Sequence, residues 1–216
     1  MSIITVSRLY GSGGSEVAAM VAAELGWALL DNAVVDAVAV RLGVTPALVA
    51  AREERVPSLV ERLTDAMALG SQDWITPFVA SKQRPTDEQL LEVTRHIVEE
   101  AIAAGPLVVV GRGAQAMLAE RSDALHVFCG APRPALIERV INREGLTRDE
   151  ATRLVDDTNA QREQWVARHW KRKWRAPENY HLCINTDWLG MRGAAELIVS
   201  AARLHFGLPG ESTARH

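Results

Sequence analysis

The stretch Val6-Ser7-Arg8-Leu9-Tyr10-Gly11-Ser12-Gly13-Gly14-Ser15-Glu16 decides the fold of this chain. The β-branched run at residues 2–7 predicts a strand, and residues 16–25 predict a helix that ends at Gly26. The glycines therefore lie between a strand and a helix. There the N–H groups of the first helical turn point outward, and glycine lets the backbone approach an anion closely. This placement predicts a phosphate-binding loop, and a plain turn is the alternative interpretation.

The rest of the chain alternates short apolar strands with helices. Strands are predicted at 27–30, 107–110, 125–128 and 181–184, and helices at 33–42, 86–104, 132–144, 147–157 and 193–205. This alternation predicts an α/β fold with a five-stranded parallel sheet flanked by helices, in which ligands bind beyond the carboxyl ends of the strands. The helical, charged texture of residues 45–105 predicts an inserted helical lobe.

The composition limits the class of protein. The chain has 216 residues, of which 48% are hydrophobic, and this predicts a single domain over residues 1–206 with a flexible tail at 207–216. The net charge of −3 excludes a globally basic protein. No apolar run reaches the ~18 residues of a membrane span. Because the start lacks a signal-peptide pattern and Cys129 and Cys183 are isolated, we expect a cytoplasmic protein without membrane association.

Lysine is rare in this chain. Of 24 basic residues only Lys82, Lys171 and Lys173 are lysines, which a compositional bias toward arginine would explain. The glycine loop therefore lacks the lysine of the usual Walker pattern, and its lysine and hydroxyl positions hold Gly14, Ser15 and Glu16. Arg8 would supply the missing positive charge, since a guanidinium binds phosphate oxygens in a bidentate manner. A surface arginine at a strand end is the alternative.

Two further polar residues follow predicted strands. Arg112 comes between two glycines after the strand at 107–110, and we prefer a ligand-phosphate contact to a structural ion pair. Asp31 follows the strand at 27–30 and would either contact a nucleotide or cap the helix that begins near Ala33. The histidines form no zinc-ligand spacing.

The segment 162–175, REQWVARHWKRKWR, is the densest cluster of charge. It would form a lid whose arginines close on a triphosphate. A solvated helix with Trp170 and Trp174 on its apolar side is the second interpretation. A nucleic-acid surface on which these tryptophans stack against bases is the third. His126 and Cys183 fall in predicted strands and are expected in the core.

The loop segment 6–16, together with Gly111-Arg112-Gly113 and Leu182-Cys183-Ile184-Asn185-Thr186, resembles the cytidylate kinase-like family, a divergent branch of the P-loop nucleoside monophosphate kinases. The resemblance spans about residues 2–203. It implies a helical NMP-binding lobe at about 45–105 and a LID at about 139–176. The implied activity is transfer of the γ-phosphoryl group of ATP to a nucleoside monophosphate, typically CMP or dCMP, with Mg²⁺.

The resemblance also implies roles for single residues. Arg112 would hold the acceptor nucleotide, Asp31 would face the monophosphate site, and Arg162 would face the phosphates. The residues themselves add the expectation that Arg8 joins Arg112 and Arg162 in catalysis, that Arg168 and Arg172 close over the substrate, and that the carboxylate of Glu16 binds the metal. The residues expected to contact ATP are Gly11, Ser12, Gly13, Gly14, Ser15, Glu16, Arg139 and Arg143.

The chain departs from the family pattern at the loop. Ser15 stands where the branch commonly has arginine, and Gly14 and Glu16 stand where ordinary cytidylate kinases have lysine and threonine. Gly113 replaces an aspartate, and Asn159 is the candidate replacement for a LID aspartate. Because the lysine stabilises the transition state, a catalytically impaired nucleotide sensor or interaction protein is the alternative. Apolar positions at 59–69 would pack internally or form a homodimer.

Overall fold

The computed structural model describes residues 1–31, 87–111 and 113–209. The chain divides into two compact units, Met1–Leu29 with Pro106–His216, and Leu30–Gly105. The predicted helix at 33–42, the apolar positions at 59–69 and most of the inserted lobe lie outside the described residues. Arg112 and the tail from residue 210 lie outside them as well.

A five-stranded sheet organises the fold, as the sequence predicted. Its strands run in the order β2-β3-β1-β4-β5, and the β1–β3, β1–β4 and β4–β5 pairs are parallel. The central strand β1 is buried along its whole length, which suits a strand covered on both faces. The strands are β1 Ile3–Arg8, β2 Ala28–Asp31, β3 Leu107–Val110, β4 Ala124–Gly130 and β5 Leu182–Asn185.

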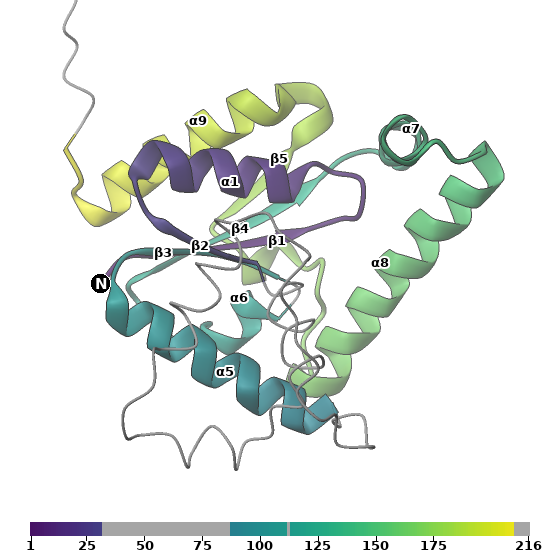
Figure 1. Cartoon of the computed structure of the whole chain (residues 1–216). Coiled ribbons are helices and arrows are strands. Elements are labelled where there is room, and N and C mark those ends of the chain that lie inside the picture. Colours follow the sequence, from purple (N-terminus) through teal and green to yellow (C-terminus); the bar gives the residue numbers. More distant parts are fainter. Residues whose placement is uncertain (32–86, 112, 210–216) are drawn as a thin grey trace, which may run out of the picture. The chain divides into compact units, whose positions relative to one another are not determined.

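Helices α1 (Gly14–Leu25) and α9 (Thr186–Phe206) lie side by side on one face of this sheet (Figure 1). Val17 and Val21, one helical turn apart on α1, are fully buried in the core beneath them. Burial of a side chain of this kind contributes about 1.5–3 kcal/mol. The short helix α6 (Ala114–Met117) lies on the opposite face, next to β1. In the other unit, α5 (Asp87–Ala104) confirms the predicted helix up to Ala104.

Helices α7 (Arg133–Glu144) and α8 (Arg148–Trp170) follow β4 and pack against each other, and Figure 1 shows α7 end-on while α8 runs across the view. The predicted capping box at the start of α8 is present, with Thr147 and Glu150 as partners. The predicted end of this helix near residue 157 is wrong. No glycine or proline interrupts the chain before Trp170, so the helix continues until Lys171, which adopts a left-handed conformation with φ of 57°.

Two expectations near the C-terminus are corrected. Helix α9 begins at Thr186 rather than near residue 193, because Asn185 caps it by accepting from the N–H groups of Asp187 (3.0 Å) and Trp188 (3.3 Å). A kink at Gly190 separates this first turn from the rest of the helix. Cys183 is exposed instead of buried, since β5 is the last strand of the sheet.

Among the helices of the described residues, none has both the length and the hydropathy of a membrane span. His126 on β4 is buried, as expected from its place in a predicted strand.

Candidate functional site

The predicted loop connects β1 to α1 and provides no side-chain cap at the start of the helix. Gly13 is the N-cap residue, with φ of 73°, and a glycine has no side chain that could accept a hydrogen bond from the first turn. The first N–H groups of a helix have no partner within the helix, and the helix dipole adds partial positive charge there. This positive φ favours glycine, and an ideal Cβ at Gly13 would also lie 2.6 Å from Sδ of Met191. The local geometry is that of an anion-binding turn.

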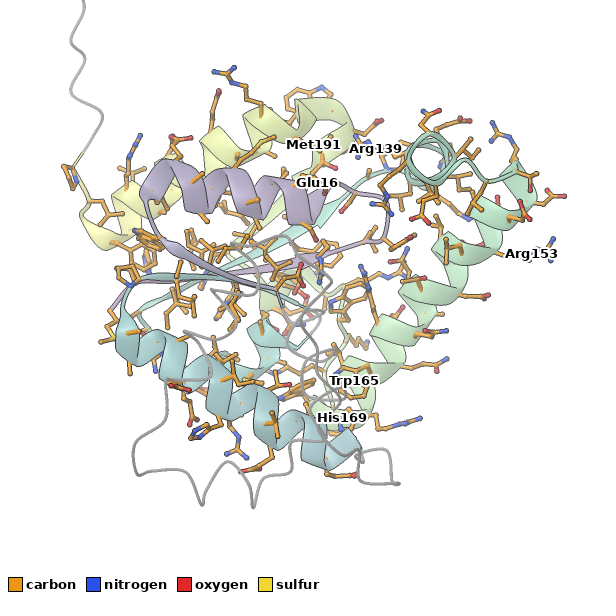
Figure 2. The ribbon with its side chains drawn as sticks, in the orientation of Figure 1. Glu16, Arg139, Arg153, Trp165, His169 and Met191 are labelled. Atoms are coloured by element: carbon orange, nitrogen blue, oxygen red, sulfur yellow. The ribbon has the colours of Figure 1, made fainter. Side chains whose placement is uncertain are left out.

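The carbonyl of Ser12 is held on the protein side of the loop. It accepts hydrogen bonds from Oγ1 of Thr186 (2.6 Å) and from Nη1 of Arg139 (3.1 Å). The hydroxyl of Ser12 donates to the carbonyl of Leu9 at 2.8 Å. Figure 2 shows Arg139 on α7 and Met191 on α9 near the end of α1 whose first turn contains Glu16. These hydrogen bonds direct the carbonyl of Ser12 toward α7 and α9.

Gly14 lies too close to its neighbours to carry a side chain. An ideal Cβ at this position would stand 2.5 Å from Cβ of Arg8 and 3.0 Å from Cβ of Cys129. Both of these atoms are attached to strand backbone, so neither can swing aside. The conformation of this loop therefore excludes a lysine at position 14 for steric reasons. Burial raises the pKa of the Cys129 thiol to about 12, so the thiol beside the loop stays neutral.

Arg8 places a guanidinium beneath the loop. Its side chain is 8% exposed, and Nε donates to Oγ of Ser15 at 3.1 Å. The alternative of a surface arginine is therefore wrong. The carbonyl of Arg8 accepts a hydrogen bond from Nη1 of Arg162 at 2.8 Å, which brings α8 to the end of β1. The loop thus has a buried cation at the first turn of α1, although it has no lysine.

Tyr10 joins the loop to α7 and α8. Its N–H donates to Oδ1 of the buried Asn159 at 2.9 Å. Its ring centroid lies 5.1 Å from Cζ of Arg143 and 5.6 Å from Cζ of Arg162. Two predicted LID arginines are therefore gathered around one aromatic ring next to the glycines.

Glu144 completes this arrangement. Its Oε1 accepts from the phenol of Tyr10 at 2.5 Å and from Nη2 of Arg143 at 2.8 Å. These two hydrogen bonds, first from Tyr10 and then from Arg143, lower the pKa of Glu144. Burial and the bond to Glu144 raise the pKa of Tyr10. Near neutral pH the carboxyl is therefore ionised and the phenol is protonated.

Arg139 contacts the loop from the protein side. Besides Ser12, it donates to Oγ1 of Thr186 (3.1 Å) and to the carbonyl of Thr186 (3.0 Å), and it lies 3.5 Å from Asp187. In this structure Arg139 therefore positions the loop, and its predicted contact with ATP stays a prediction.

The roles of the other predicted ligands stay predictions. Arg112 lies outside the described residues, and Asp31 ends β2 in the other compact unit. Arg168 follows Arg162 by six residues, about 9 Å along the helix axis. Arg172 lies beyond the helix and contacts Glu120 and Asn179, each at 3.4 Å. Trp165 and His169 mark this distant end of α8 in Figure 2.

The tryptophans of the basic segment do not share one helix face. Helix α8 ends at Trp170, and Trp174 follows in the next segment, where it is 1% exposed and packs edge-on against Phe128. Ring atoms of Trp170 lie 2.4 Å from the position that a Cβ of Gly113 would take. Burial of Trp174 removes it as a stacking surface, so the interpretation of this pair as a base-stacking platform loses its support.

The donor set for a metal is small in the part of the chain that the structure describes. No group of three or more His, Cys, Asp or Glu side chains is placed there to hold an ion. Glu16 is exposed in the first turn of α1. Mg²⁺ is commonly bound by one or two carboxylates together with substrate phosphates, so a single carboxylate at this position fits such a site.

The contacts of four contributors to the site were not predicted from the sequence: Tyr10, Glu144, Asn159 and Thr186. Tyr10 lies within the loop motif, and Asn159 matches the position of a LID aspartate, so both had a signal. Thr186 ends the quoted segment 182–186, so it had a signal as well, although its contact with the loop did not follow from it. Glu144 reaches the loop from α7, and its role follows only from packing.

Solved structures share this architecture. An uncharacterized protein from Eubacterium ventriosum matches with a TM-score of 0.67 and 18% identity, over 94% of this chain and 98% of that one. A gluconokinase from Sinorhizobium meliloti matches with a TM-score of 0.51 and 15% identity, over 97% and 98%. At these identities the likeness concerns the fold alone.

No curated protein sequence matches the chain. The model of the cytidylate kinase-like family matches residues 3–188, a span that runs from β1 to the first turn of α9 and includes the glycine loop, α7 and α8. The chain therefore has a kinase-like P-loop fold and belongs to the cytidylate kinase-like family.

Proposed function

We propose that this protein is a nucleotide-binding phosphotransferase that moves the γ-phosphoryl group of ATP to a nucleoside monophosphate such as CMP or dCMP. The observation that carries the proposal is the glycine loop, which leads into the N-terminus of α1 without a side-chain cap, in a chain that belongs to the cytidylate kinase-like family. In such a reaction the bond between the γ-phosphorus and the bridging oxygen of ADP breaks, and a new bond forms to a phosphate oxygen of the acceptor.

The cations around the loop support this proposal. Phosphoryl transfer needs positive charge close to the transferred group, and positioned charge supplies most of the catalysis. The guanidinium of Arg8 is bonded to Ser15 under the first turn of α1, and Arg143 and Arg162 flank Tyr10. Arg8 would take the role of the absent lysine.

Mg²⁺ is the proposed cofactor, and Glu16 is the residue that would hold it together with the nucleotide phosphates. When bound, the ion would neutralise charge on the phosphates. The exposed carboxylate of Glu16, one residue after Ser15, is the feature that supports this assignment.

The test compares ATP binding and turnover in three proteins. The wild-type chain should bind ATP with Mg²⁺ at millimolar concentration or below, and it should convert CMP to CDP. Arg8→Ala removes the guanidinium and should reduce turnover about 10²-fold or more, by analogy with the loss of one preorganised donor. Arg192→Ala is the matched control, because its partner is Glu196 on the surface of α9. Calorimetry and a coupled kinase assay give the readouts, and wild-type protein that binds no ATP would refute the proposal.

The steric exclusion of lysine at Gly14 favours a second candidate function, a nucleotide sensor that binds ATP without transferring phosphate. This candidate predicts ATP binding that depends on Arg8, with no turnover of any nucleoside monophosphate. Turnover that disappears in the Arg8→Ala protein would exclude it.

A further inference from the structure

Tyr10 brings two positively charged side chains together at the edge of the glycine loop. Cζ of Arg143 lies 5.1 Å and Cζ of Arg162 lies 5.6 Å from its ring centroid. An aromatic face attracts a guanidinium through its quadrupole, so the ring offsets part of the repulsion between the two cations. The backbone of Tyr10 is itself fixed by Asn159. The ring therefore has a defined position relative to the loop.

Glu144 places a carboxylate in the same cluster. It pairs with Arg143 at 2.8 Å and accepts the phenol proton of Tyr10 at 2.5 Å. The hydrogen bonds from Tyr10 and Arg143 lower the pKa of this carboxyl, so it carries its negative charge at neutral pH. A phosphate oxygen and a carboxylate oxygen make the same kind of bond to a guanidinium. Glu144 thus occupies on Arg143 a position that a phosphate group would also favour.

We propose that Tyr10 is a positioning residue for polyphosphate binding: its ring holds Arg143 and Arg162 beside the glycine loop, and Glu144 is an internal counter-ion that a polyphosphate displaces from Arg143. This inference rests on the proposed function, because it concerns the same loop and the phosphates of the same nucleotide. It adds that Tyr10 and Glu144 together set the affinity of the loop for a polyphosphate. The ring gathers the cations, and the carboxylate reduces affinity for anions that are too weak to compete with it.

The experiment titrates inorganic tripolyphosphate into the full-length chain by calorimetry. Tyr10→Leu removes the ring and should weaken binding about tenfold, since two cation–ring contacts are lost. Tyr10→Phe keeps the ring and should stay within about twofold of wild type. Glu144→Gln removes the competing charge and should tighten binding about threefold or more. Glu138→Gln is the matched control. Like Glu144, Glu138 lies on α7, and it forms a surface ion pair with Arg148.

The outcomes separate this inference from the proposed function. Wild-type protein that binds neither ATP nor tripolyphosphate overturns both. Wild-type protein that binds, with Tyr10→Leu equal to it or with Glu144→Gln no tighter than Glu138→Gln, overturns the inference alone. A purely structural role for the cluster predicts weaker binding in every variant, so tighter binding in Glu144→Gln is the diagnostic result. If Tyr10→Leu fails to fold, as judged by circular dichroism, the comparison of Glu144→Gln with Glu138→Gln decides.

Discussion

The contact between Gly14 and Arg8 determines how the loop carries its charge. The Cβ of Arg8 and the Cβ of Cys129 leave no room for a side chain on residue 14. The guanidinium of Arg8 in turn reaches Ser15 at the first turn of α1. The arginine at the end of β1 therefore requires glycine at position 14, and the same arginine supplies the positive charge at the first turn of α1. At this position lysine is excluded because a side chain would collide with Arg8 and Cys129.

Restoring the usual lysine should damage the protein. Gly14→Lys and Gly14→Ala both add a Cβ 2.5 Å from Cβ of Arg8. Overpacking of this kind costs about 1–3 kcal/mol, so both variants should unfold at lower urea concentration than wild type. Equilibrium urea unfolding followed by circular dichroism measures the change. A Gly14→Lys protein as stable as wild type would show that the close approach is absent.

At the scale of elements, the loop is held by the first turn of α9 and by α7. The hydroxyl of Thr186 donates to Ser12 and also lies 3.1 Å from the carbonyl of Gly130 at the end of β4. Arg139 adds a second contact to Ser12 from α7. Three elements thus meet at one buried hydroxyl, and the order of the loop depends on their packing.

Thr186→Val should loosen the glycine loop. The substitution preserves most of the side-chain shape but removes the hydroxyl at a fully buried position, which costs about 1–3 kcal/mol. The amides of Ser12 and Val17, bonded to Leu9 and Gly13, should then exchange faster with solvent deuterium. Thr186→Ser keeps the hydroxyl and should keep the slow exchange. Equal exchange in the valine and wild-type proteins would contradict this role for Thr186.

At the scale of the whole molecule, the sheet core contains an ionisable residue. His126 on β4 is 3% exposed, and Nδ1 lies 2.8 Å from Oγ1 of Thr5 on the neighbouring strand. Its ring stacks on His181, with centroids 5.1 Å apart. Burial, followed by the nearby His181, lowers the pKa of His126 from 6.5 to about 4. The folded protein therefore holds this imidazole neutral at pH values where the unfolded chain protonates it.

The stability of the fold should decrease as the pH falls below about 6.5. Between this value and pH 4 the unfolded state binds a proton at His126 that the folded state does not. The difference amounts to about 3 kcal/mol of lost stability by pH 4. His126→Asn keeps a polar partner for Thr5 without this titration, so its unfolding free energy should fall less steeply. Urea unfolding at several pH values compares the two proteins, and parallel profiles would contradict the assignment.

The alternation of strands and helices made most of the sheet predictable. The β-branched run of β3, Leu107–Val110, was located to the residue, and the capping box at Thr147 marked the start of α8. The errors came where local signals mislead. Glycine at position 190 kinks α9, so the turn before it was not predicted as part of the helix. Cys183 was predicted in the core because it lies in an apolar run. The exposure of Cys183 depends on the place of β5 at the edge of the sheet. The order of the strands cannot be predicted from the sequence of one strand.

The sequence alone determined the class of fold, the position of the glycine loop between β1 and α1, and the absence of a lysine from that loop. These features depend on neighbours along the chain: β-branched runs, glycine spacing and helix caps. The tertiary structure decided that Arg8 is buried under the loop, that Thr186 and Arg139 hold Ser12, and that Tyr10 gathers Arg143 and Arg162. The contacts of Ser12 and Tyr10 join residues more than a hundred positions apart, and only the packing of α7, α8 and α9 around the end of the sheet brings these residues together.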